Sequence, residues 1–283
     1  MRDRGRGLWL HSRVIAVAVK AALASPLLLA GPATAQDAPV RYRNQESNRL
    51  VIHTQYGPLS ITIEGSSQYT ARFAQPDSII VRYERFDVEQ FCICGHVVVP
   101  TAKLLSQPTI LRVDRKGRTT VLSSPEGDDR GGMATDPVMQ FGGMFYRFPA
   151  ALLSPRAEWD DSSTDSHTHS HKGTTDRTTV TRRGHYRVER DTIFDSTPAW
   201  VVTVRERVQL ESHLATVQND VQGLVTLDGE ETGALIVAKD DLGALYRKEH
   251  GSFEGVLNIE SKSQRPFAAR MSLRYDATLQ RVP

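Results

Sequence analysis

Hydrophobic and polar residues alternate along several long stretches of this chain. The clearest is 59–73, LSITIEGSSQYTARF, where apolar side chains fall mainly on odd positions and polar ones on even positions. Side chains of an extended chain point alternately to opposite faces, so this stretch predicts β-structure with one buried and one hydrated face. At about 3.3 Å per residue it would be far longer than an ordinary strand. We therefore expect a bend or bulge at Gly65, Ser66 and Ser67.

Similar alternation predicts β-strands along most of the remaining chain. It is equally regular over 267–279, and near Arg85 it changes phase, which is typical of a β-bulge. Further strands are expected over 40–54, 78–91, 109–113, 118–122, 180–194 and 200–210, and shorter ones from 221 onward. The turn sequences expected to separate those shorter strands are Asp228-Gly229, Asp240-Asp241 and His250-Gly251.

One helix is predicted between these strands. Asp136 is a typical N-cap, Pro137 suits the first helical position, and Pro149 ends the segment. Methionine-rich surfaces adapt to varied apolar ligands, although such a helix more commonly fills the concave side of a sheet as core. The candidate ligand-binding side chains of this helix are Met139, Phe141, Met144, Phe145 and Phe148.

These patterns together predict a mainly β protein. We expect a long curved antiparallel sheet, an open or half-closed barrel, with one short apolar helix packed on its concave face. An outer-membrane barrel is the rival interpretation, because its strands alternate as well. Such a barrel carries aromatic girdles, and aromatic residues make up only 7% of this chain. The sequence therefore favours the soluble sheet.

The first 35 residues have the features of a secretory signal peptide. Arginines precede an apolar run, and Ala33-Thr34-Ala35 is a small-residue cleavage site. A transmembrane anchor is the alternative, but Lys20 and Pro26 interrupt the run. We expect cleavage after Ala35, leaving residues 36–283 as a single periplasmic or secreted domain with no transmembrane segment.

Removing the signal peptide reverses the sign of the net charge. The whole chain has 35 basic and 33 acidic residues, and five of the basic ones and one acidic one lie in residues 1–35. The mature chain therefore carries a net charge of −2, and it has no basic stripe of the kind that binds nucleic acid. We expect no nucleic-acid partner.

A polar segment over 160–179 contains three alternating histidines, His167, His169 and His171. We expect an exposed His-rich loop at a hairpin tip. In an extended chain the three imidazoles share one face, which suits Zn²⁺, Cu²⁺ or Ni²⁺. A solvated loop whose histidines bind metal only adventitiously is the alternative, since nothing apolar nearby would fix the ligands. The only cofactor expected is a weakly bound transition metal.

The two cysteines, Cys92 and Cys94, are separated by a single residue. Two cysteines in an oxidising compartment commonly form one disulfide. Residues i and i+2 of a straight strand lie near the upper limit for such a bond, so it would require a bend, which Gly95 could allow. A metal site that includes His96, or two small buried side chains, are the alternatives.

The predicted order of elements resembles a known fold. A signal peptide, long meandering strands and an apolar helix are similar to the periplasmic lipoprotein carriers, whose unclosed barrel is covered by helices. The run Gly184-His185-Tyr186-Arg187-Val188, followed by Pro198-Ala199-Trp200-Val201-Val202, also resembles uncharacterised exported β-rich proteins of Gram-negative bacteria. This resemblance implies a fold and transfers no functional residue.

Signatures of catalysis are absent from the sequence. It has no G-x-S-x-G, H-E-x-x-H, Walker or Rossmann pattern. We therefore expect an exported non-enzymatic protein that binds an apolar or amphiphilic ligand, such as a lipid. A periplasmic transition-metal-binding protein and a structural or interaction module of the envelope are the alternatives.

Overall fold

The computed structural model describes residues 38–74, 77–92, 95–98, 101–113, 119–123, 153–171, 174–216, 221–262 and 264–283. These residues form twelve strands and one short helix. In the first half they are β1 (Val40–Thr54), β2 (Gly57–Ala74), β3 (Ser78–Cys92), β4 (Gly95–Val98), α2 (Ala102–Ser106), β5 (Thr109–Val113) and β6 (Thr119–Ser123). In the second half they are β7 (Glu158–His171), β8 (Thr174–Phe194), β9 (Thr197–Thr216), β10 (Val221–Ala238), β11 (Ala244–Ser261) and β12 (Gln264–Val282).

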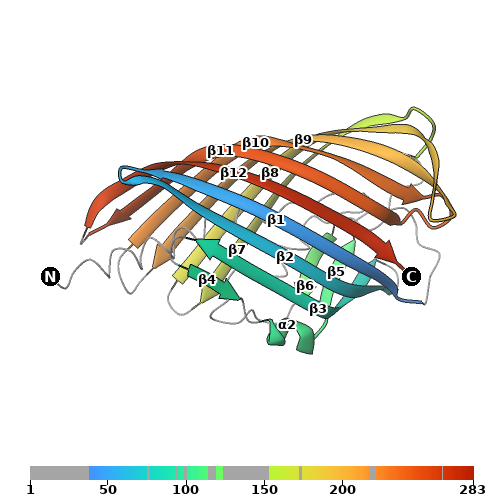
Figure 1. The fold of residues 1–283 in the computed structure, drawn as a ribbon, viewed down its shortest axis with the longest axis horizontal. Coiled ribbons are helices and arrows are strands. Elements are labelled where there is room, and N and C mark those ends of the chain that lie inside the picture. Colours follow the sequence, from blue (N-terminus) through green and yellow to red (C-terminus); the bar gives the residue numbers. More distant parts are fainter. Residues whose placement is uncertain are drawn as a thin grey trace.

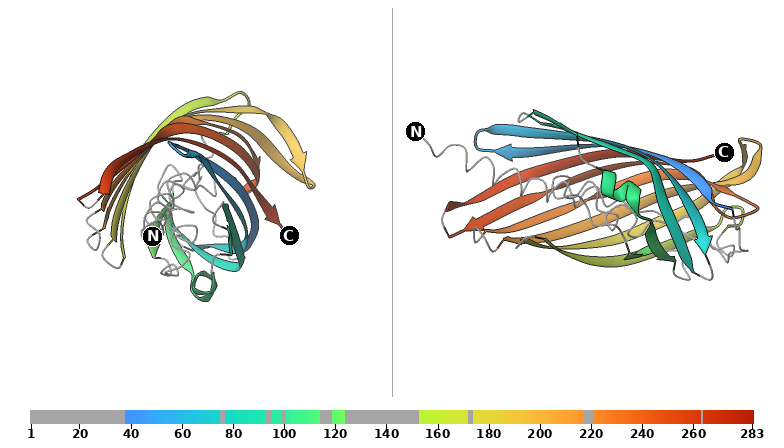
Figure 2. Two further views of the ribbon diagram at one scale, coloured as in Figure 1. Left: turned by 60° about the vertical axis from the view of Figure 1, so that its left-hand side comes forward. Right: turned by 90° about the horizontal axis from the view of Figure 1, so that it is seen from below.

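The strands form one antiparallel sheet that bends into a trough (Figure 1). The order of its strands is β6-β5-β3-β2-β1-β12-β11-β10-β9-β8-β7. The short strand β4 lies outside this linear order and pairs with β3. The first long strand pairs with the last, so that β1 and β12 lie near the middle of the sheet. Figure 2 shows the sheet curving around a concave side, with β6 and β7 at its two ends. Among the described strands these ends do not pair, which confirms the predicted open antiparallel sheet.

The two most regular stretches, 59–73 and 267–279, lie in strands with one buried face, as their alternation predicts. Ile61, Ile63 and Tyr69 of β2 are buried, and Met271 and Leu273 of β12 are buried in the same way. The whole of 59–73 lies in the single strand β2, and Gly65 pairs in register on both sides, so the predicted bulge at Gly65 is wrong. The register between β2 and β3 shifts instead between Gln68 and Tyr69 of β2. Gln68 pairs with Arg85 of β3, and Tyr69 pairs with Tyr83. The phase change near Arg85 is thus confirmed as a bulge.

The strands after residue 221 are longer than the sequence predicted. β10 and β11 each have 18 residues, and Asp228-Gly229 and His250-Gly251 lie within them. The glycines serve close packing here and not turns. A Cβ at Gly229 would lie 2.6 Å from Cδ1 of Phe253, so only glycine leaves room for that ring. The third predicted turn, at Asp240-Asp241, is confirmed.

The predicted His-rich loop over 160–179 is also a pair of strands. β7 pairs with β8 from Glu158 to His171, so that only a short connection remains at the tip. Hydroxyl groups stabilise this polar hairpin across the strands: Oγ1 of Thr164 lies 3.2 Å from Oγ1 of Thr181, and Oγ of Ser166 lies 3.0 Å from Oγ1 of Thr179. Polar composition suggested a loop, whereas threonine also favours strands.

Two apolar clusters cover much of the concave face. The larger extends from β1, β2 and β3 through β12 and β11 to β9, and includes Leu50, Leu257 and Leu273. The smaller lies at the other end of β8, β9 and β10, around Val188 and Val202. Leu104 of α2 packs into the larger cluster. The helix predicted over 136–148 lies outside the described residues, and no helix within them is long and apolar enough to cross a membrane.

Candidate functional site

A band of charged side chains crosses the concave face between the two apolar clusters. Each residue in its central part is at most 6% exposed. The band consists of Arg182 on β8, Glu206 on β9, Glu231 on β10, Arg247 and Glu249 on β11, and the half-buried Glu46 on β1. Buried charges are costly unless they are paired, so a band of six such groups is the most unusual feature of this face.

Strand register brings the acidic members together. Glu206 lies directly opposite Glu231, and Glu249 lies opposite Gly233, two residues further along β10. On its other side Glu249 lies opposite Ala277 of β12, which in turn lies opposite Glu46. Directly opposed like charges are unfavourable in a sheet. The sheet therefore concentrates acidic groups where packing alone would place apolar ones.

Hydrogen bonds hold part of this band in place. The hydroxyl of Tyr186 donates to Oε1 of Glu206, and the ring of Tyr186 stacks on Trp159 with centroids 5.3 Å apart. Nη2 of Arg247 donates to Oε2 of Glu249. Nδ2 of Asn44 donates to Oε1 of Glu46 over 2.6 Å.

Oε2 of Glu206 and Oε1 of Glu249 are buried carboxylate oxygens that lack a hydrogen-bond partner within the described part of the chain. A buried acceptor without a donor costs roughly 1–3 kcal/mol. The band thus retains unused acceptor capacity at two points on neighbouring sides of β10.

Burial raises the pKa of three of the glutamates. The pKa of Glu206 rises to about 8, because the carboxyl is desolvated and the charge of Glu231 adds repulsion, while Arg182 opposes the rise. Burial also raises the pKa of Glu249 and of Glu46, against the opposing charge of Arg247. With four carboxyl groups and two guanidinium groups, the band is neutral when two carboxyls are protonated.

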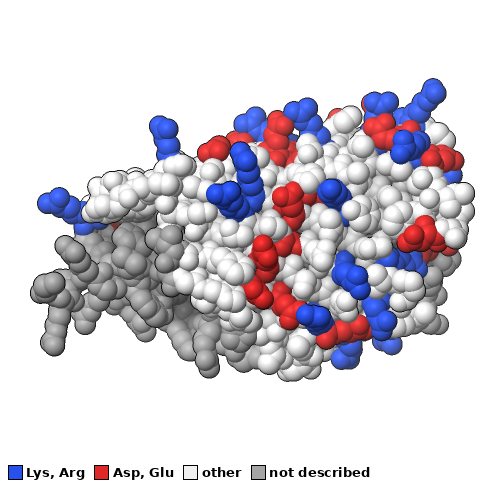
Figure 3. Space-filling model, in the orientation of Figure 1, with Lys and Arg blue, Asp and Glu red and all other residues white. Residues whose placement is uncertain are grey.

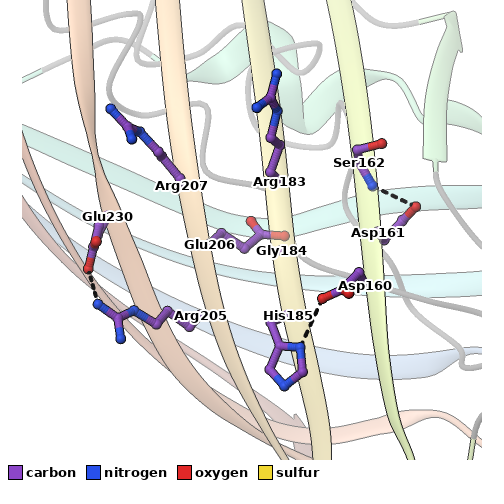
Figure 4. Close-up of a pocket in the computed structure, with 10 residues that line it drawn as sticks. All are labelled: Asp160, Asp161, Ser162, Arg183, Gly184, His185, Arg205, Glu206, Arg207 and Glu230. Atoms are coloured by element: carbon purple, nitrogen blue, oxygen red, sulfur yellow. Dashed lines mark hydrogen bonds and ion pairs between the residues drawn. The ribbon is translucent and has the colours of Figure 1, made fainter.

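Gly184 makes room for the carboxyl of Glu206. These two residues lie opposite each other on β8 and β9, and Figure 4 shows the side chain of Glu206 pointing toward Gly184. A Cβ at Gly184 would lie 2.4 Å from the hydroxyl oxygen of Tyr186 and 2.6 Å from Oε1 of Glu206. Glycine is therefore required where the tyrosine and the carboxyl meet.

An open groove of about 550 Å³ is lined mainly by residues of the opposite, convex side of the same strands, and Gly184 and Glu206 also belong to its lining (Figure 4). Exposed ion pairs border it: Nδ1 of His185 lies 2.9 Å from Oδ1 of Asp160, and Nη2 of Arg205 lies 2.8 Å from Oε2 of Glu230. Figure 3 shows charged residues of both signs over the side of the molecule seen in Figure 1. Exposed pairs of this kind contribute little stability, and the groove has the character of a hydrated surface.

The sequence-predicted site residues lie elsewhere. Met139, Phe141, Met144, Phe145 and Phe148 lie outside the described residues, so their role stays a prediction. Cys92 is disulfide-bonded. Cys94, its predicted partner, also lies outside the described residues, and the pairing stays a prediction.

The three histidines lie in β7 and not in a loop. His167, His169 and His171 pair with Thr178, Asp176 and Thr174 of β8, although their side chains are outside the described part. Among the described side chains, no group of three or more His, Cys, Asp or Glu residues is arranged to hold a metal ion. Metal binding by the histidines stays a prediction.

Replacing all three histidines with alanine is expected to change the free energy of unfolding in metal-free buffer by less than about 1 kcal/mol. The reason is that backbone pairing with β8 runs the full length of β7 and does not depend on these side chains. Thermal melts with and without Zn²⁺ provide the measurement. A drop of many degrees without metal would show that the histidines are structural.

Comparison with known proteins gives only distant similarities. No protein-family model and no curated protein matches the chain. Neisserial surface protein A is 8% identical, with 86% of this chain and 97% of that chain covered and a TM-score of 0.23. A DUF1329 family protein from Desulfovibrio piger is 8% identical, with 95% and 92% covered and a TM-score of 0.16.

An outer membrane protein of Pseudomonas aeruginosa, OpdK, is 7% identical, with 84% of this chain and 99% of that chain covered and a TM-score of 0.20. Similarities at this level assign no function.

Proposed function

We propose that this protein is an exported, non-enzymatic protein that binds an amphiphilic ligand on the concave face of its sheet. One observation carries the proposal: a buried charged band interrupts a largely apolar trough. A molecule with an apolar chain and a polar group would match both parts of that surface.

The apolar part of the face is continuous across neighbouring strands. Val225 lies opposite Leu257, and Leu257 lies opposite Ala269, so three strands present apolar side chains in one row. All three residues are at most 5% exposed. The row is therefore already shielded from water, and an aliphatic chain that enters it would gain about 0.8 kcal/mol for each of its own methylene groups that becomes buried.

Exposed arginines on the convex face indicate that this side of the sheet contacts water. Arg183 and Arg207 lie directly opposite each other there, and both are exposed. An arginine facing the middle of a bilayer would cost about 2–4 kcal/mol. These strands therefore present their convex side to water, which leaves the concave side for an apolar ligand.

The proposal predicts that the protein retains lipid when it is purified gently, and that Phe253→Ala reduces this retention. Phe253 is 5% exposed and stacks on Tyr275 with ring centroids 6.0 Å apart. Truncating a fully packed phenylalanine costs about 3–5 kcal/mol, whereas one that lines a ligand space should cost less and weaken binding instead. Native mass spectrometry and thermal melts measure the two effects.

Ile193→Ala is the matched control, because Ile193 is 76% exposed and lies in the hairpin of β8 and β9. It should change neither retention nor stability. Suppose that Phe253→Ala lowers the free energy of unfolding by the full penalty of about 3–5 kcal/mol, and that neither the variant nor the wild type retains lipid. The trough is then a solid core, and the proposal is wrong.

A further inference from the structure

We propose that the charged band binds a primary ammonium group, so that the ligand of the concave face is an amphiphile with an amine head group. This inference rests on the proposed function and adds the chemical class of the head group. It follows from the charge of the band, from its unused acceptors and from the apolar surfaces on both sides of it.

The charge of the band favours a cation. It contains four carboxyl groups and only two guanidinium groups. Arg247 is committed to Glu249 by an ion pair. Arg182 lies close enough to Glu206 and Glu249 to affect both electrostatically. When the four carboxyl groups are ionised, an excess of negative charge remains on the face, and a bound cation would neutralise part of it.

The unused acceptors favour a group that donates several hydrogen bonds. Glu206 and Glu249 are 3% and 0% exposed, and each has one buried oxygen without a partner among the described residues. They flank β10, where Glu231 lies directly opposite Glu206. An ammonium group has three donors and no acceptor, and charge-assisted hydrogen bonds to carboxylates are stronger than neutral ones.

Other head groups fit this band less well. A carboxylate or phosphate would be repelled by the same glutamates when they are ionised, and a hydroxyl would supply one donor and no charge. The described residues contain no group of three or more acidic, His or Cys side chains arranged to hold a metal ion. A primary amine supplies both the charge and the donors.

Apolar side chains border the band on two sides of the same strands. On β9, Glu206 lies between Val204 and Val208, and all three face the concave side. Those valines belong to the two different apolar clusters. An amine in the band would therefore place an attached aliphatic chain directly on an apolar surface.

The test compares ligands that share a chain and differ in the head group. The lipid-depleted full-length protein is titrated with dodecylamine, dodecanol and dodecanoate by calorimetry at about pH 9, where an alkylamine is still protonated. Dodecylamine should bind at least about ten-fold more tightly than dodecanol, a difference of about 1.4 kcal/mol, and dodecanoate should bind most weakly. Butylamine, which has the head group and a short chain, should bind far more weakly than dodecylamine.

The Glu206→Gln variant should lose most of the preference for dodecylamine over dodecanol while its affinity for dodecanol stays unchanged. Glutamine still accepts the hydrogen bond of Tyr186 but carries no charge. Glu231→Gln should give the same loss, which keeps the test available if the first variant folds poorly. Glu211→Gln, on the exposed face of the same strand β9, is the matched control and should keep the preference.

The possible failures are distinct. Equal binding of the three dodecyl compounds would overturn the ammonium site and leave the proposed function standing. Failure of every dodecyl compound to bind would overturn the proposed function. Butylamine binding as tightly as dodecylamine would support the ammonium site and overturn the binding of an amphiphile.

Discussion

Replacing Arg247 with methionine is expected to lower the free energy of unfolding by about 3–5 kcal/mol. Arg247 is 5% exposed and its guanidinium group donates to Glu249, which is fully buried. Methionine fills a similar volume but leaves that carboxyl without its ion pair. Removing one partner of a buried pair is costly because the other charge stays in the protein interior.

This loss should be smaller at low pH. The carboxyl of Glu249 already has a raised pKa because of burial, and without Arg247 its pKa rises further. At acidic pH it can therefore bind a proton and lose its charge. Urea denaturation of Arg247→Met at several pH values measures the effect, which should grow as the pH rises.

Two further variants isolate the buried pair. Arg205→Met removes an exposed partner of Glu230 on the convex face and should cost at most about 1 kcal/mol. The double replacement Arg247→Met with Glu249→Leu should recover most of the stability, because no unpaired charge remains. If Arg247→Met costs no more than Arg205→Met, the buried pair does not have the strength that its burial implies.

The stability of the wild-type protein is expected to fall as the pH rises from about 4.5 to about 8. Glu206 has a pKa of about 8 in the folded protein, against an ordinary value of 4.5. The folded state therefore binds a proton more tightly than the unfolded state over this range. The stabilising contribution is complete below the ordinary pKa and is lost as the pH passes through the folded one.

The loss should be on the order of several kcal/mol, since each unit of pKa difference corresponds to about 1.4 kcal/mol. Glu206→Gln resembles the protonated form and keeps an acceptor for the hydroxyl of Tyr186. This variant should be more stable than wild type at about pH 9, with a weaker pH dependence. Denaturant titrations of both proteins across this range provide the measurement.

The Glu211→Gln variant should follow the wild-type curve, since Glu211 is exposed on the convex face. Wild-type stability that rises steadily from pH 4.5 to 8 would contradict the raised pKa of Glu206. Unchanged pH dependence in Glu206→Gln would assign the effect to other members of the band, of which Glu249 and Glu46 also have raised pKa values.

Alternation along the chain was sufficient to predict the class of fold. Residues 59–73 and 267–279 alternate over their whole length, and each lies within one long strand. A single buried face requires this period of two, so the pattern carries the information locally. Where glycine or polar residues interrupted the pattern, as at Gly229 or over 160–179, the sequence suggested turns or loops that the sheet does not contain.

One signal for the site was present in the sequence. Glu206 falls in phase with Val204 and Val208, which indicates a charged side chain on the apolar face of its strand. Arg182 is likewise in phase with Val180 and Tyr186, and Glu231 with Leu227 and Leu235, but glycines at 184, 229 and 233 interrupt these patterns. The phase of the alternation therefore carries a signal for several members of the band, although the prediction from the sequence named none of them.

Side-chain alternation is a local property of extended backbone, so the amino-acid sequence is enough to predict a sheet with one apolar face. Which residues meet on that face depends on how distant strands pair. Glu46 and Glu249 are far apart in the sequence, and they approach because β1 and β11 both pair with β12 at Ala277. Register between distant strands depends on the packing of the whole sheet, so the charged band exists only in the folded protein.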